Sequence, residues 1–166
     1  MKTVVALGSN LGDRLSILQT VCRELEALSA TSLRKSSVYE STPVDCPPGS
    51  PKFLNAVVEL GVDDHTSPYE LLGKLQAIER ELGRKPKTIH NEPRPIDLDL
   101  ICCGELRVNT PELTVPHPRA HLRRFVLQPL CDLSPGLILP GQNKSVSEIL
   151  EALPADSTVR AFSESW

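Results

Sequence analysis

Residues 94–101 read Arg94-Pro95-Ile96-Asp97-Leu98-Asp99-Leu100-Ile101, and two carboxylates stand there inside an otherwise apolar run. Side chains alternate between the two faces of a β-strand, so Asp97 and Asp99 point the same way, roughly 6.6 Å apart along the strand. Two like charges on one half-buried face are costly unless cations neutralise them. Mg²⁺ binds such carboxylates together with phosphate oxygens. The stretch therefore predicts a strand with a metal site, and the alternative is an edge strand with a solvated polar face.

Length and composition are those of an ordinary globular protein. The chain has 166 residues, 40% of them hydrophobic and 23% charged, which is enough for one domain over residues 1–166 with its own core. A formal net charge of −3 favours neither nucleic acid nor an anionic membrane as partner. The sequence has neither a signal-peptide pattern nor a run of transmembrane length, so we expect a cytoplasmic protein, and we expect a monomer.

The cysteines predict no disulfide framework and no zinc site. They are five in number, without a C-x-x-C pair, at Cys22, Cys46, Cys102, Cys103 and Cys131. An odd number without metal-ligand spacing is typical of reduced thiols in a core or strand.

The order of expected elements predicts an α+β fold. Apolar periodicity and turn residues predict strands over residues 3–7, 33–42 and 53–62 and from 96 onward, with helices over 14–28 and 68–82. This is the order of a ferredoxin-like β-α-β-β-α-β unit, an antiparallel sheet with both helices on one face. The opposite face would stay free. A short hairpin after Gly104 and helical segments after Arg123 would form a C-terminal extension.

The third expected strand has two different faces. Leu54, Ala56 and Val58 form an apolar face, while Phe53 and Asn55 share the other. An aromatic ring beside an amide can stack on a flat heterocycle and hydrogen-bond its edge. The alternative is a core phenylalanine beside a satisfied strand amide.

Two loops and one asparagine are candidates for binding. Residues 44–52 are too rich in Pro and Gly for regular structure, and either bind a ligand or are surface loop. Residues 84–95 carry Arg84, Lys85, Lys87, His90 and Arg94 against Glu92. Basic charge tethered beside a metal site predicts a bridging polyphosphate, and the alternative is a solvated charge run. Asn10, in a turn after the first strand, either binds a ligand or caps the turn.

Motifs in five places resemble those of the 6-hydroxymethyl-7,8-dihydropterin pyrophosphokinase family of folate biosynthesis. They are Gly8-Ser9-Asn10-Leu11-Gly12, Phe53-Leu54-Asn55-Ala56, Glu79 before Gly83-Arg84, Pro93-Arg94-Pro95-Ile96-Asp97-Leu98-Asp99, and Val115-Pro116-His117-Pro118. The resemblance covers nearly the whole chain. It implies Mg²⁺-dependent transfer of the terminal diphosphate of ATP to the pterin hydroxymethyl group, with release of AMP.

The resemblance also implies roles for individual residues. Asp97 and Asp99 match the ligands of two Mg²⁺ ions. The catalytic positions of the family match Arg84, Arg94, Asp97, Asp99 and His117. Arg123 matches a further position beside the ATP phosphates. The ATP-binding positions match Gln76, Glu79, Arg84 and Arg94. The pterin pocket matches Thr42, Pro43, Val44, Phe53, Asn55 and Phe125, with the two phenylalanines on either side of the ring.

The chain departs from the family pattern in the basic stretch. Members commonly carry a tryptophan shortly before the arginine that Arg94 matches, and this chain has His90-Asn91-Glu92-Pro93 there. A second arginine often found in this loop is missing, with Pro86 and Lys87 nearby. Lysine lacks the bidentate fork of arginine. We therefore expect looser closure of this loop.

Two other classes of function fit the sequence less well. A ferredoxin-like RNA-binding module needs several basic and aromatic residues on its central strands, but this chain has three Phe and puts two carboxylates on that face. A domain that only senses a metal or ligand would not need the arginines of residues 84–95.

Overall fold

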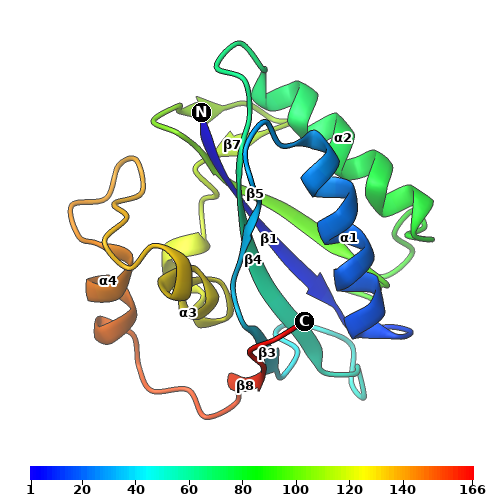
Figure 1. The fold of residues 1–166 in the computed structure, drawn as a ribbon. Helices are drawn as coiled ribbons and strands as arrows, with labels where there is room; N and C mark the ends of the chain where they lie inside the picture. Colours follow the sequence, from blue (N-terminus) through cyan, green and yellow to red (C-terminus); the bar gives the residue numbers. More distant parts are fainter.

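An antiparallel sheet of six strands forms the centre of the protein (Figure 1). A computed structural model describes all 166 residues. The strands are β1 (Lys2–Ser9), β2 (Arg34–Lys35), β3 (Val38–Ser41), β4 (Phe53–Gly61), β5 (Asp97–Cys103) and β8 (Arg160–Ser163). Their order is β5-β1-β4-β3-β8, with β2 paired to β4 next to β3. The sheet therefore brings β5, the strand of the two aspartates, beside β1 and near the start of β4.

The strand expected over residues 33–42 is interrupted at Ser36 and Ser37, which separates β2 from β3. Ser36 still bonds to Val57 of β4, but partly through its side chain. The backbone N–H of Ser36 donates to Val57 O over 2.9 Å, and the Ser36 hydroxyl accepts from Val57 N over 2.9 Å. A hydroxyl that takes the place of a backbone carbonyl breaks the regular ladder.

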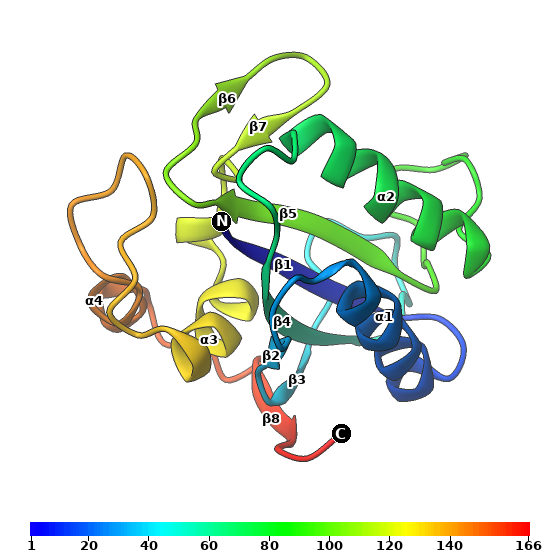
Figure 2. The same ribbon diagram turned by 45° about the horizontal axis from the view of Figure 1, so that its top comes forward.

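Helices α1 (Arg14–Leu28) and α2 (Pro68–Glu81) lie together on one face of the sheet, as predicted (Figure 2). Asp13 caps α1 by accepting from Ser16 N over 3.2 Å. The buried stripes of these helices join the apolar face of β4 and β5 in the larger core cluster, which includes Leu18, Val21, Leu25, Leu54, Leu71, Leu75, Ile78, Leu98 and Leu100. Amphipathic helices bury such stripes against a sheet because that removes apolar surface from water.

Ser67 caps the N-terminus of α2, but a reciprocal capping box is not formed. The Ser67 hydroxyl accepts from Tyr69 N over 3.2 Å. Glu70 instead pairs with Lys74 one turn later, with 2.8 Å between Oε1 and Nζ. The i,i+4 ion pair competes for the carboxylate that a capping box would use.

The opposite face of the sheet is not free, contrary to expectation. A short 3₁₀ turn, η1 (Ala120–Leu122), leads into α3 (Arg124–Leu133), and α4 (Val146–Ala152) packs outside α3 (Figures 1 and 2). A second apolar cluster fills this layer, with Val4, Val57, Ile101, Cys102, Val126, Leu127, Leu130, Leu139 and Val146 among its members. The alternate positions of the central strands are apolar enough to require this cover. None of the helices is long and apolar enough to cross a membrane.

The expected hairpin lies further along the chain than predicted. The chain turns at Gly104 (φ 51°), as its sequence indicates, but the next residues do not pair with β5. Instead β6 (Val108–Asn109) pairs with β7 (Thr114–Val115). The outer edge of β5 is met by the following segment, where His117 N donates to Ile101 O over 2.8 Å.

Candidate active site

A cavity of about 580 Å³ opens beside the N-terminal end of β5. Its walls are the β3–β4 loop (residues 42–52), the basic loop (residues 84–95) and the segment around the start of α3. The predicted site residues that line it are Thr42, Val44, Phe53, Asn55, Arg84, Arg94, Asp97, Asp99, His117, Arg123 and Phe125. Pro43, Gln76 and Glu79 do not line it, and Gln76 is exposed on α2.

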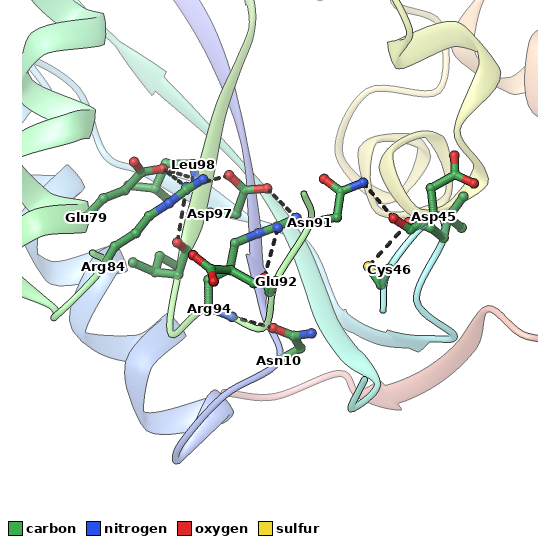
Figure 3. A network of polar contacts seen from close by, with 12 residues as sticks. Asn10, Asp45, Cys46, Glu79, Arg84, Asn91, Glu92, Arg94, Asp97 and Leu98 are labelled. Atoms are coloured by element: carbon green, nitrogen blue, oxygen red, sulfur yellow. Dashed lines mark hydrogen bonds and ion pairs between the residues drawn. The ribbon is translucent and has the colours of Figure 1, made fainter. Parts of the chain in front are cut away.

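Asp97 is already neutralised by two arginines (Figure 3). Arg84 donates from Nη1 to Asp97 Oδ1 over 2.7 Å, and Arg94 Nη2 lies 3.4 Å from Asp97 Oδ2. The guanidinium groups come from opposite ends of the basic loop. The carboxylate therefore ties both ends of that loop to β5.

Asp99 has no ion-pair partner, and its charge is the one left uncompensated. Burial, and then the neighbouring charge of Asp97, raise the pKa of Asp99 to about 6, while Arg123 and Arg84 act in the opposite direction. A cation bound nearby would stabilise a carboxylate that is buried, lies beside another carboxylate and has no ion-pair partner.

The pair of carboxylates fits Mg²⁺ on the chemistry of its oxygen donors. The protein offers no cluster of three or more acidic, histidine or cysteine ligands. Mg²⁺ does not need one, because it commonly uses one or two carboxylates and takes its remaining ligands from water and substrate phosphates. The fit therefore depends on Asp97, Asp99 and a phosphate-bearing ligand together.

Glu79 of α2 holds Arg84 and β5 in place from behind the cavity wall. Its Oε1 accepts from Arg84 Nη1 and from the backbone N–H of Leu98, each over 2.7 Å (Figure 3). Burial raises the pKa of Glu79, and its bond from Leu98 N and the charge of Arg84 oppose that shift. Arg84 thus bridges two carboxylates, and its orientation is fixed before any ligand binds.

Two aromatic rings line the cavity, and each lies close to an arginine. The Arg94 guanidinium lies 5.2 Å from the centre of the Phe53 ring, and Arg123 lies 5.5 Å from that of Phe125. Asn55 is buried beside Phe53 and donates from Nδ2 to Ser41 Oγ over 2.6 Å. A flat, π-rich face and an oriented amide therefore stand at the same end of the cavity.

His117 lines the cavity as a neutral imidazole ring. Its Nδ1 accepts from Arg119 N over 3.1 Å, which leaves the proton of the neutral ring on Nε2. Burial, and then the charges of Arg123 and Arg119, lower the pKa of His117 to about 4.

Asn10 is a structural residue of the site rather than a ligand group. Its Oδ1 accepts from Arg94 N over 2.8 Å, and its Nδ2 donates to Pro51 O over 3.3 Å. Its own N–H donates to Arg94 O over 3.2 Å. The asparagine therefore holds the basic loop and the β3–β4 loop together at their bases, and it is fully buried there.

Sequence reasoning missed several lining residues: Asp45, Cys46, Arg119, Arg124 and Asp156. Arg119 follows the Val115–Pro118 motif and could have been found as a further basic neighbour of His117. Asp156 lies between α4 and β8, in a segment without a local chemical pattern. Only the return of the chain to the sheet brings it to the cavity.

Residues 4–135 match the sequence model described as 7,8-dihydro-6-hydroxymethylpterin-pyrophosphokinase (HPPK). The chain belongs to the HPPK family. A relative from Pseudomonas aeruginosa, named 2-amino-4-hydroxy-6-hydroxymethyldihydropteridine pyrophosphokinase, is 39% identical over 160 residues, 96% of each chain.

Other HPPK relatives are much longer. A mitochondrial folate synthesis bifunctional protein of Arabidopsis thaliana is 42% identical over 132 residues, which are 80% of this chain and 23% of that protein. The chain thus spans about a fifth of the length of the longer relatives. A crystal structure of HPPK-DHPS in complex with substrates has a TM-score of 0.72 at 13% identity, over 91% of this chain and 45% of that one. At that identity the likeness shows the shared fold.

Proposed function

We propose that the protein transfers diphosphate from ATP to the hydroxymethyl group of 6-hydroxymethyl-7,8-dihydropterin, with Mg²⁺, and releases AMP in folate biosynthesis. Membership of the HPPK family supports this proposal. The observation that carries it is one cavity that contains the carboxylates Asp97 and Asp99, several arginines and two aromatic rings. Neither an RNA-binding surface nor a sensing domain needs this combination.

The pterin would bind at the aromatic end of the cavity. Phe53 and Phe125 supply apolar faces for a planar ring, and Asn55 supplies an oriented amide. Thr42, Pro43 and Val44 complete this end in the proposal. Stacking combined with hydrogen bonds to a ring edge selects a flat heterocycle over other apolar groups.

ATP would bind with its phosphates between β5 and the arginines. Arg84, Arg94, Arg123 and the Nε2–H of His117 are the proposed phosphate-side groups, and Gln76 and Glu79 remain proposed nucleotide-side positions. The buried Nε of Arg94 has no hydrogen-bond partner within the chain. An unsatisfied guanidinium nitrogen at this position supports a negatively charged ligand.

The proposed reaction forms a bond between the pterin hydroxymethyl oxygen and the β-phosphorus of ATP. The bond from that phosphorus to the oxygen of the α-phosphate breaks, the electron pair leaves with AMP, and the hydroxyl proton is lost. Two Mg²⁺ ions held by Asp97 and Asp99 would neutralise charge on the phosphoryl oxygens. Arg84 and Arg94 would stabilise charge as the diphosphate moves, because such transfers depend on positioning and electrostatics.

The same proposal extends to the fold. We infer a ferredoxin-like unit built from β1, α1, the consecutive strands β2 and β3, β4, α2 and β5, within one pyrophosphokinase domain of residues 1–166. The sheet order β5-β1-β4-β3 and the position of α1 and α2 on one face support it.

Incubation of the purified protein with ATP, Mg²⁺ and the hydroxymethyl pterin tests the function, with nucleotides separated by chromatography. We expect AMP formation that requires both pterin and metal. Asp99→Asn should lose turnover while the exposed α1 variant Glu24→Gln keeps it. Formation of ADP, or no turnover by correctly folded wild-type protein, would refute the proposal.

A further inference from the structure

Arg14, the first residue of α1, joins the two ends of the β3–β4 loop. Its Nη1 lies 2.9 Å from Glu40 Oε2, on β3 just before the loop, and 2.9 Å from the backbone oxygen of Lys52, at the loop's last residue. Both charged side chains are about three-quarters buried, with exposed fractions of 26% for Arg14 and 28% for Glu40. The contact is therefore a partly desolvated, charge-assisted one, which is stronger than a surface ion pair.

These ends are next to the cavity. Glu40 stands two residues before Thr42, and Lys52 stands directly before Phe53. Thr42 and Phe53 both line the cavity. A shift at Arg14 would therefore move two walls of the aromatic end at once.

Apart from Arg14, two side chains hold the loop from outside it: Asn10 Nδ2 donates to Pro51 O, and Asn91 Nδ2 donates to Asp45 O. The loop contains no helix or strand, and Asp45 and Gly49 adopt left-handed backbone angles, with φ of 53° and 79°. Its internal bonds are few: Ser50 donates to Pro47 O, and Cys46 Sγ donates to Val44 O. A loop of this kind takes its position from a few anchoring contacts, and those of Arg14 lie at both of its ends.

The C-terminal segment covers Arg14 from outside. Strand β8 pairs with β3, and Arg160 stands opposite Glu40 in that pairing. The Phe162 ring centre lies 5.9 Å from the Arg14 guanidinium. These residues follow the region matched to the HPPK family model, residues 4–135.

We propose that Arg14 is a positioning residue for pterin binding, which fixes both ends of the β3–β4 loop through Glu40 and the Lys52 carbonyl. The inference rests on the proposed function, since it takes the aromatic end of the cavity as the pterin site. It predicts that Arg14 acts on pterin affinity and not on ATP affinity, because its contacts lie on the β3–β4 loop and not on the basic loop.

The test compares Arg14→Gln with Arg14→Lys, Glu40→Gln and a matched control, Arg23→Gln. Arg23 lies on α1, exposed, and donates only to Thr20. In titrations followed by pterin fluorescence, with Mg²⁺ and a non-hydrolysable ATP analogue, Arg14→Gln should weaken pterin binding about tenfold, equivalent to about 1.4 kcal/mol. Arg14→Lys retains a charged donor and should stay within about threefold of wild type. Glu40→Gln should weaken pterin binding, and Arg23→Gln should not.

Kinetics and hydrogen exchange separate positioning from general instability. Arg14→Gln should raise the KM for pterin, leave the KM for ATP unchanged, and speed amide exchange in residues 43–52 without ligand. If a folded Arg14→Gln protein binds pterin like wild type and exchanges these amides no faster, the inference is wrong while the proposed function stands. If Arg14→Gln does not fold, Arg14→Lys and Glu40→Gln decide on the same measurements. If wild-type protein itself does not bind the pterin, the proposed function fails, and the exchange data still decide whether Arg14 holds the loop.

Discussion

The side-chain amide of Asn91 donates to the backbone oxygen of Asp45 over 2.9 Å, and so connects the basic loop to the β3–β4 loop across the cavity (Figure 3). Both residues have left-handed backbone angles, with φ of 51° for Asn91 and 53° for Asp45. His90 Nε2 lies 2.9 Å from the same amide nitrogen. The stretch His90-Asn91-Glu92-Pro93 thus provides a hydrogen bond between the two loops.

Removal of this bond should speed pterin release. Asn91→Gly accepts the left-handed backbone and deletes the donor, so we expect about three- to tenfold faster dissociation, the equivalent of one net hydrogen bond. Stopped-flow fluorescence measures the rate. Asn91→Asp also lacks the donor and should behave similarly. Equal dissociation rates in wild type and Asn91→Gly would mean that the two loops are not coupled through this contact.

The two aspartates should differ in their effect on stability. In metal-free buffer at pH 7, Asp97→Asn should lower the free energy of unfolding by about 1–2 kcal/mol, since Arg84 and Arg94 each lose a charged partner. Asp99→Asn should leave stability equal or higher, because its carboxylate is buried without an ion pair. Both should lose turnover. Chemical denaturation checks the contrast, and the same sign of change in both variants would contradict it.

His117 should remain neutral well below neutral pH. Its folded-state pKa of about 4 lies below the ordinary value of 6.5, so between these values the unfolded chain binds a proton that the folded chain does not. The stabilisation from neutral His117 is complete above pH 6.5 and is lost as the pH falls toward 4. NMR of the ring nitrogens should show the Nε2–H form at pH 6. His117→Gln should show a shallower fall in stability between pH 6.5 and 4, and an identical slope would contradict the assignment.

Cys46 should be the first thiol to react with a disulfide reagent. It is half-buried and lines the cavity, whereas burial raises the pKa of Cys22 and Cys103 to about 11 and that of Cys102 to about 12. The thiolate is the reactive form. We expect one fast phase, absent in Cys46→Ser and slowed by bound pterin. A fast phase that survives Cys46→Ser would show that another thiol is the exposed one.

Local sequence patterns predicted the helices and strands of the sheet layer, but they did not predict that α3 covers the second face of the sheet. The apolar spacing from Leu18 to Leu25 reports which face of α1 is buried, and the alternation from Phe53 to Val58 reports which residues of β4 face the helices α1 and α2. The cover by α3 was missed because it depends on where that helix returns to the sheet. The hairpin after Gly104 was misplaced for a similar reason, since residues 115–117 compete for the edge of β5.

The sequence by itself determined the family, the α1 and α2 helices, and the placement of Asp97 and Asp99 on one face of a strand, because spacing and residue type along one segment decide these. Only the tertiary structure decided that Asp97 is paired with Arg84 and Arg94 while Asp99 is not. It also decided that Arg14, Asn10 and Asn91 connect the loops around the cavity. These contacts join residues far apart in the chain, and their partners are backbone oxygens as often as side chains. A periodic pattern in the sequence does not show which distant backbone oxygen a side chain will contact, so these contacts could be identified only in the folded structure.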